Sequence, residues 1–149
     1  MMWYSTCMNV TLKETKDLDF DRVVDLFYEV HFLSSPEKRG IYTSAIKQAF
    51  LNSQYVVGAY VNDKLVGFVR VLTDESLFAT IWNMIVDPKY QNMGIGEKLI
   101  SKCLSHYPNL HFFLFADDDT QGFYEKTGFT LHKHGMFLEK GREVCVIYT

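Results

Sequence analysis

A loop with two glycines, set between an apolar run and an amphipathic segment, constrains the fold of this chain more than any other feature. The apolar run covers residues 79–86 and is closed by Asp87 and Pro88, and the loop at residues 91–96 reads Gln-Asn-Met-Gly-Ile-Gly. Beyond the loop, apolar side chains recur at helical spacing over residues 99–107. The pattern predicts a strand, a tight loop and a helix, and the glycines let a ligand approach the loop backbone closely.

The start of the predicted helix is a place where an anion can bind. The first N–H groups of a helix have no partner within it, and together with the helix dipole they favour a phosphate or pyrophosphate. A P-loop requires Gly-Lys-Ser/Thr where this chain has Gly96, Glu97 and Lys98, and the dinucleotide fingerprint requires a third small residue where it has Leu99. Gln-x-x-Gly-x-Gly after a strand that ends in Val-Asp-Pro resembles instead the coenzyme A loop of the GNAT N-acetyltransferases. On its own, the pattern also suits an ordinary turn from strand to helix.

Length, charge and apolar runs limit the classes of function. The 149 residues predict a single domain that spans residues 1–149. A net charge of −3 with scattered Lys and Arg argues against nucleic-acid binding. No apolar run approaches the roughly 20 residues that span a bilayer, and the N-terminus does not read as a signal peptide. Three widely spaced cysteines, Cys7, Cys103 and Cys145, fit free thiols in a reducing, cytoplasmic compartment.

Hydrophobic periodicity and turn residues predict the remaining elements. Strands are expected over residues 7–13, 55–61, 64–72, 78–86, 111–115, 129–137 and 143–148, with a hairpin turn at Asn62 and Asp63. Helices are expected from Asp17 or Asp19 to residues 34–36, from Thr43 or Ser44 after a polar loop at residues 37–40, from the glycine loop to Pro108, and around residues 123–126 with Gly128 as the stop. Strands and helices share one core, which predicts an α+β, or mixed α/β, domain. Its sheet is expected to be central, twisted and mostly antiparallel, flanked by about four helices.

The order of these elements and three features in register resemble the GNAT N-acetyltransferases over nearly the whole chain. The features are the strand and loop from Trp82 to Gly96, the segment Phe-Tyr-x-x-x-Gly-Phe at residues 123–129, and their separation by one helix and one strand. A closer similarity joins residues 79–82, 86–91, 114–117 and 135–137 to the branch that contains plant-type serotonin N-acetyltransferases and their bacterial relatives. The resemblance implies the GNAT acyl-CoA N-acyltransferase fold, acetyl-CoA as co-substrate without a metal, and a primary amine of an arylalkylamine-like acceptor.

The resemblance also implies how acetyl transfer is carried out. A neutral amine attacks the thioester carbonyl directly, an oxyanion develops beside a bulge in the strand before the loop, and a thiolate leaves. The place of this bulge in the family matches Met84, Ile85 and Val86. Tyr124 matches the position of the general acid, and proton transfer from a phenol with a pKa near 10 to a thiolate near 8.5 costs only about 2 kcal/mol. The cofactor-binding residues implied are Met84, Ile85, Val86, Gln91, Asn92, Met93, Gly94, Ile95, Gly96, Asp117 and Tyr124. Asp117 departs from the pattern, since many members of the family have Asn there.

The acceptor side is expected to be formed by aromatic and polar residues of the first helix and of the strand before the loop. The residues predicted to contact the acceptor are Phe27, His31, Trp82 and Asn83. The general base is not identified, with Glu29, His31 and Asn83 as candidates, and His31 can equally be a satisfied residue at a helix end. His132 and His134 share one face of a strand but lack the further ligands of a metal site. Cys103 reads as an inert, buried thiol.

Alternatives to the small aromatic amine remain. Three acidic residues, Asp117, Asp118 and Asp119, keep a polyamine acceptor open, although such a cluster is more often a solvated turn. A protein amine is a further variant. The alternative outside the enzymes is a non-catalytic module that binds acetyl-CoA, either to sense it or to serve a partner protein. The partners expected are acetyl-CoA and the amine, with no nucleic acid and no membrane, and assembly into a homodimer is left open.

Overall fold

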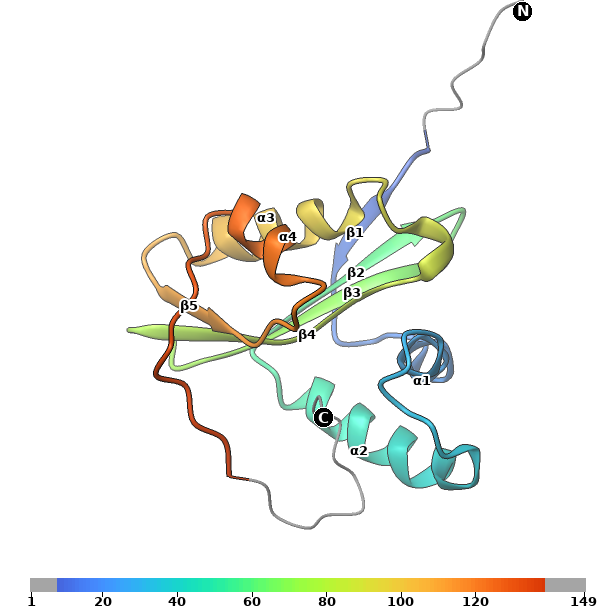
Figure 1. Cartoon of the computed structure of the whole chain (residues 1–149). Coiled ribbons are helices and arrows are strands. Elements are labelled where there is room, and N and C mark those ends of the chain that lie inside the picture. The colour runs from blue at the N-terminus through green and yellow to red at the C-terminus, as the bar shows by residue number, and fades with distance from the viewer. Residues whose placement is uncertain (1–7, 139–149) are drawn as a thin grey trace, which may run out of the picture.

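A five-stranded sheet with its strands in the order β1-β2-β3-β4-β5 forms the centre of the computed structural model, which describes residues 8–138 (Figure 1). In chain order the elements are β1 (Thr11–Glu14), α1 (Phe20–Glu29), the 3-10 helix η1 (Pro36–Lys38), α2 (Arg39–Leu51), β2 (Tyr55–Val61), β3 (Lys64–Thr73), β4 (Phe78–Val86), the 3-10 helix η2 (Pro88–Tyr90), α3 (Ile95–His106), β5 (His111–Leu114) and α4 (Gln121–Lys126). Neighbours from β1 to β4 are antiparallel, and β5 is parallel to β4. The predicted α+β class with a mostly antiparallel sheet is confirmed.

Helices cover both faces of the sheet. α1 and α2 pack on one face, and α3 and α4 lie over the other (Figure 1). Each face has its own hydrophobic cluster, with Phe27, Phe50 and Phe68 in the first and Val69 and Leu99 in the second. Since successive side chains of a strand point to opposite faces, β2 and β3 contribute to both clusters and are buried along most of their length.

Two turns form where single residues predict them. Asn62 and Asp63 adopt positive φ values of 49° and 62° between β2 and β3, as a tight hairpin turn requires. Gly128 has φ 102° after α4, where the Phe129 N–H donates to the Tyr124 carbonyl (3.2 Å). Glycine tolerates this left-handed conformation, so the predicted hairpin and the predicted end of α4 are both confirmed.

The start of α2 differs from the prediction. Residues 37–40, expected as a polar loop, belong to η1 and to the first turn of α2, which begins before Thr43. Pro36 stands at the start of η1, where its fixed φ suits a helix and its missing N–H removes no hydrogen bond. Arg39 then forms an ion pair with Asp25 of α1 (Nη2–Oδ1 2.9 Å), so packing against α1 supports the early start.

The ends of the chain account for the other differences. The prediction of a strand over residues 129–137 was wrong, because residues 129–138 contain no strand. A strand requires a partner for its backbone hydrogen bonds, and the partner predicted here, residues 143–148, lies outside the described residues. The predicted first strand is observed only as Thr11–Glu14, and Cys7 also lies outside the described part. Within residues 8–138, no helix is both long and apolar enough to cross a bilayer.

Candidate active site

The edge of β4 that faces β5 is the first component of the site. β4 pairs with β5 only from Phe78, opposite His111, to Ile81, opposite Leu114. β5 ends there, whereas β4 continues to Val86. Beyond Ile81, the backbone on this edge of β4 therefore has no residue of β5 opposite it, and a ligand can take the place of the missing strand.

A β-bulge interrupts β4 where β5 ends. Arg70 of β3 pairs with Asn83 and Val71 pairs with Ile81, so Trp82 is an extra residue on β4. An extra residue shifts the alternation of backbone and side-chain directions by one position. The bulge thus re-aims every residue that follows it on β4.

The last residues of β4 direct alternate backbone groups toward the β5 side. The Asp87 N–H donates to the Val66 carbonyl of β3 (2.8 Å), and backbone groups alternate along an antiparallel pair. Because Asp87 points to β3, Met84 and Val86 point to the other side. The bulge was expected within the segment from Met84 to Val86 but lies at Trp82. The bulge still determines the direction of the backbone groups of Met84 and Val86, because the extra residue shifts the alternation along β4 by one position.

An interior ion pair holds the turn that follows β4. Asp87 is only 2% exposed, and its Oδ2 accepts a hydrogen bond from Nη2 of Arg22 on α1. Its Oδ1 accepts from the Lys89 N–H (2.9 Å) at the start of η2. Arg22 also donates to the Leu65 carbonyl (3.1 Å) and to Glu29 (2.9 Å). One guanidinium therefore connects α1, β3 and the entrance to the glycine loop.

The glycine loop presents backbone N–H groups at the start of α3. Gly94 has φ 83° and is the N-cap residue, and Asn92 before it also has a positive φ of 61°. The first helical hydrogen bond runs from the Lys98 N–H to the Gly94 carbonyl (3.1 Å). The N–H groups of residues 95–97 precede it and can bind an anion. Gln91 braces the loop, since its Nε2 donates to the Val86 carbonyl (3.0 Å).

The two glycines of the loop have different physical roles. A Cβ atom at Gly96 would lie 3.1 Å from Cζ of Phe123 and 3.7 Å from Cε of Met84. The missing side chain lets α4 pack against the start of α3, a role that the sequence pattern did not predict. At Gly94, a Cβ atom would meet nothing closer than 3.9 Å, and the requirement is the positive φ alone. A substitution at Gly94 therefore tests the conformation of the loop without disturbing the packing of α4.

Tyr124 lies on α4 next to the ring that fills the space at Gly96. Its ring centre is 5.1 Å from that of Phe123 and 6.0 Å from that of Phe129. The half-buried side chain belongs to the hydrophobic cluster that also contains Met84 and Val86. Packing of α4 thus brings the predicted proton donor to the same cluster as the open edge of β4.

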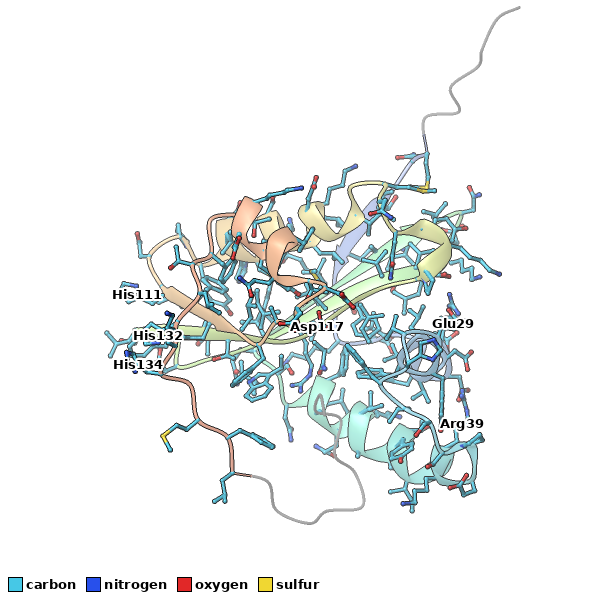
Figure 2. The ribbon with its side chains drawn as sticks, viewed as in Figure 1. Glu29, Arg39, His111, Asp117, His132 and His134 are labelled. Atoms are coloured by element: carbon cyan, nitrogen blue, oxygen red, sulfur yellow. The ribbon has the colours of Figure 1, made fainter. Side chains whose placement is uncertain are left out.

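Asp117 organises the turn that leads into α4. Its Oδ1 accepts hydrogen bonds from the N–H (2.8 Å) and the hydroxyl (2.7 Å) of Thr120. Figure 2 shows this residue in the segment between β5 and α4. Its predicted contact with the cofactor stays a prediction, and the carboxylate already has a role in the turn.

The residues predicted to contact the acceptor lie in different surroundings. Phe27 is only 1% exposed inside the core between α1 and the sheet, so its ring is not accessible to a ligand. Trp82 is 37% exposed, and its ring centre lies 5.7 Å from that of Phe115. Asn83 accepts a hydrogen bond at Oδ1 from Nε of Arg70 (2.7 Å). Trp82 and Asn83 are together at the bulge, whereas Phe27 belongs to the core.

His31 occupies the position after the end of α1 that usually belongs to glycine. It is exposed and has φ 64°. The Phe32 N–H donates to the Phe27 carbonyl (2.9 Å), and the His31 N–H donates to the Tyr28 carbonyl (3.0 Å). This pair of hydrogen bonds is the Schellman motif. The backbone of His31 therefore ends α1, as the interpretation of His31 as a residue at a helix end predicts.

We expect His31→Gly to raise the free energy of unfolding by about 0.5–1 kcal/mol, because glycine adopts positive φ without steric cost. For a chain of this length, the melting temperature should rise by roughly 1–4 °C, measured by calorimetry. Acetyl transfer should be unchanged if His31 only ends α1. A stabilised variant with strongly reduced turnover would make His31 part of the acceptor site.

Sequence reasoning missed Arg70 and the contact of Arg22 with Asp87. Arg70 is the only charged residue in the run 65–72, and a lone charge in a buried strand was a usable signal. Arg22 and Asp87 are 65 positions apart, and no local pattern connects them.

Other chemically interesting side chains do not extend the site. Cys103 is fully buried, and burial raises the pKa of its thiol to about 12, which makes it unreactive at neutral pH. His132 and His134 are exposed, with ring centres 5.3 Å apart, and both are labelled in Figure 2. Within residues 8–138, no group of three or more His, Cys, Asp or Glu side chains could hold a metal ion.

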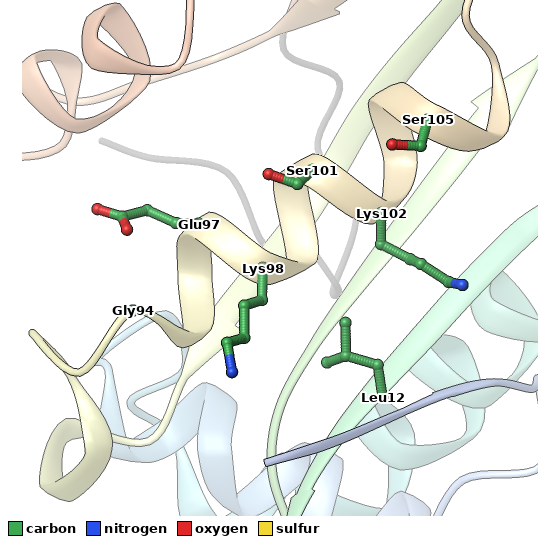
Figure 3. Close-up of a pocket in the computed structure, with 7 residues that line it drawn as sticks. All are labelled: Leu12, Gly94, Glu97, Lys98, Ser101, Lys102 and Ser105. Carbon is green, nitrogen blue, oxygen red and sulfur yellow. The ribbon is translucent and has the colours of Figure 1, made fainter. Parts of the chain in front are cut away.

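A shallow groove runs along the outer side of α3, next to β1 (Figure 3). Its volume is about 460 Å³, and its lining consists of Leu12, Gly94, Glu97, Lys98, Ser101, Lys102 and Ser105. Lys102 on this side forms an ion pair with Glu14 (3.0 Å). The groove meets the candidate site only at Gly94 and does not include the edge of β4.

Comparisons with known proteins bear on the family and the fold of this chain. The model of the acetyltransferase (GNAT) family matches residues 20–129. A ycf52-like N-acetyltransferase of Prochlorococcus marinus, described as uncharacterized, is 32% identical over 129 residues, which cover 82% of this chain and 68% of the relative. A protein of Glycine max named histone acetyltransferase TAP1 is 36% identical over 76 residues, which cover 49% of this chain and 33% of that relative. A solved GNAT-family acetyltransferase of Streptococcus pneumoniae shares the fold with a TM-score of 0.75 and 23% identity, over 91% of this chain and 100% of that one.

Proposed function

Since the chain belongs to the acetyltransferase (GNAT) family and is an acyltransferase, we propose that it moves the acetyl group of acetyl-CoA directly to the primary amine of a small, arylalkylamine-like acceptor. The observation that supports this most is that Tyr124 packs against the same hydrophobic cluster as Met84 and Val86, two residues of the open edge of β4. Acyl transfer from sulfur to nitrogen requires N–H donors for an oxyanion and a proton for the leaving thiolate. This cluster offers both kinds of group.

The start of α3 fits the pyrophosphate of coenzyme A. The N–H groups of residues 95–97 and the dipole of a 12-residue helix favour its negative charge. Gly94 supplies the backbone conformation that the loop requires. The rest of the cofactor then follows the edge of β4, where the amide and carbonyl groups of Met84 and Val86 face away from β3.

The proposed reaction balances with groups of this chain. The amine nitrogen bonds to the thioester carbonyl carbon, and the negative charge on oxygen is stabilised by an N–H group of the β4 edge. When the carbon–sulfur bond breaks, the thiolate takes the proton of the Tyr124 hydroxyl. The tyrosine regains a proton from the acylated nitrogen, which carries one excess proton after the attack of a neutral amine, so no proton is left over. An acceptor that arrives as an ammonium ion first loses its extra proton to solvent.

Exposed aromatic rings support an aromatic acceptor. Trp82 of β4 and Phe115, just after β5, lie with their ring centres 5.7 Å apart, and Phe78 of β4 and Phe113 of β5 form a second pair at 5.6 Å. All four rings are at least 37% exposed. Aromatic walls favour an apolar amine and can hold its ammonium form by its charge.

A panel of amines in a thiol-release assay tests the proposed acceptor. We expect tryptamine and phenylethylamine to have kcat/KM values at least about tenfold above those of spermidine and a lysine peptide, which is about 1.4 kcal/mol in transition-state binding. Trp82→Ala should narrow this gap, because it removes one aromatic wall. A tenfold advantage for spermidine or the peptide would contradict the proposal.

The same materials separate the enzyme from a non-catalytic sensor. Acetyl-CoA at 100 times its dissociation constant should stabilise the fold by about 2.7 kcal/mol, seen as a higher melting temperature. Stabilisation without thiol release for any amine would favour the sensor. An unchanged melting temperature at saturating acetyl-CoA would reject both.

The compartment is also part of the proposal. A buried Cys103 thiol is compatible with a reducing compartment, and on that basis we assign the protein to the cytoplasm. Fractionation with the native protein tests this assignment.

A further inference from the structure

Arg70 is a half-buried cation whose hydrogen-bond and cation–π partners among the described residues are uncharged. Its Nε donates to Oδ1 of Asn83 (2.7 Å), and its Nη1 donates to Oγ of Ser53 (3.3 Å). Its Cζ lies 5.7 Å from the ring centre of Phe50, which is a cation–π contact. The neighbours come from β4, from the last turn of α2 and from the residues just after it, so the guanidinium lies between the sheet and α2.

The other two arginines within residues 8–138 have acidic partners. Arg22 pairs with Asp87, and Arg39 pairs with Asp25. No carboxylate of the described residues lies within ion-pair distance of Arg70. Burial lowers the pKa of Arg70 to about 10, so the side chain is still charged at neutral pH. The half-buried charge is therefore available for an anion.

The chemistry of the guanidinium defines the anion. It carries five N–H donors in a planar fork, and Asn83 and Ser53 use two of them. The others match the two oxygens of a carboxylate, which arginine binds in a bidentate manner. A bound carboxylate would also offset the cost of burying an unpaired charge.

Arg70 is close to the edge of β4, where the acetyl transfer is proposed above to occur. It pairs with Asn83 at the bulge, beside Trp82, and the next residue of β4 is Met84, whose backbone faces the β5 side. Neighbouring strands lie about 4.8 Å apart and residues along a strand about 3.4 Å, so one small molecule can reach both places.

Resting on the acetyl transfer proposed above, we propose that the acceptor carries a carboxylate on a short spacer from its amine, as an aromatic amino acid does, and that Arg70 binds this carboxylate. Asn83 holds the guanidinium in orientation and is a positioning residue. The aromatic side chain of the acceptor lies against the exposed ring of Trp82. The positive charge of Arg70 repels a second ammonium group, which works against a polyamine.

Matched pairs of acceptors test this assignment in the thiol-release assay. Tryptophan is compared with tryptamine, and phenylalanine with phenylethylamine. The wild-type protein should use the carboxylated member with a kcat/KM roughly 10- to 100-fold higher, as for loss or gain of a charged hydrogen bond. Arg70→Gln should abolish the preference, and Arg70→Lys should keep part of it, because the charge remains and the fork is lost.

Arg39→Gln is the matched control, because Arg39 forms an exposed ion pair with Asp25. This variant should keep the wild-type preference for the carboxylated acceptor. A wild-type preference for the decarboxylated amines, or a preference that Arg70→Gln retains, would overturn the inference. If no amine is acetylated, calorimetric binding of N-acetyltryptophan and N-acetyltryptamine decides separately. Tighter binding of the carboxylated compound that depends on Arg70 supports the site although the transfer fails, and equal binding rejects it.

Discussion

Replacing Asp87 with Ala is expected to lower the free energy of unfolding by about 3 kcal/mol, because it leaves the Arg22 guanidinium without its interior partner. Asp87 is 2% exposed, and the side chain of Arg22 is 14% exposed. The loss should lie at the low end of the range for buried pairs, since Arg22 keeps its contact with Glu29. Urea unfolding measures the change.

The exposed pair of Arg39 with Asp25 provides the control. Its two side chains are 37% and 48% exposed, so Arg39→Ala should cost at most about 1 kcal/mol. Asp87→Asn keeps an acceptor for the Lys89 N–H but removes the charge, and it should resemble Asp87→Ala in stability. If both Asp87 variants lose less than the Arg39 variant, the ion pair does not hold the turn after β4.

Tyr124→Phe is expected to lower kcat by roughly 10- to 1,000-fold, the scale of lost general acid catalysis. The phenyl ring keeps its packing against Phe123 and Phe129, so the melting temperature and the affinity for acetyl-CoA should change little. Steady-state thiol release gives kcat, and calorimetry gives the affinity.

A matched tyrosine separates the hydroxyl of Tyr124 from a general effect of the substitution. Tyr107 lies at the C-terminal end of α3, at the opposite end of this helix from the glycine loop, and Tyr107→Phe should leave kcat unchanged. A thioester whose thiol has a lower pKa needs less help from an acid when the thiolate leaves. If such a thioester raises kcat more for Tyr124→Phe than for the wild-type protein, this further supports Tyr124 as the acid. Wild-type turnover in Tyr124→Phe would instead reduce this residue to packing.

Local patterns predicted much of the fold. Runs rich in apolar and β-forming residues located β2, β3 and β4, and Asn62 with Asp63 marked the hairpin between the first two. Gly94 and Gly128 marked positions with positive φ. These features depend on a few neighbouring residues whose conformational limits are the same in any fold. The start of α2 was missed because residues 37–40 are polar and have no apolar pattern of their own, whereas Arg39 in the first turn contacts Asp25 of α1.

The sequence by itself determined the order of elements up to α4, the strand–loop–helix unit around Gly94 and the family to which the chain belongs. Only the tertiary structure decided that the bulge lies at Trp82, that Gly96 makes room for Phe123, and that Phe27 is enclosed in the core. It also decided which arginines have acidic partners. The physical reason is separation along the chain: backbone conformation follows from adjacent residues, whereas strand register and ion pairing depend on segments that meet only after the sheet and its helices have packed.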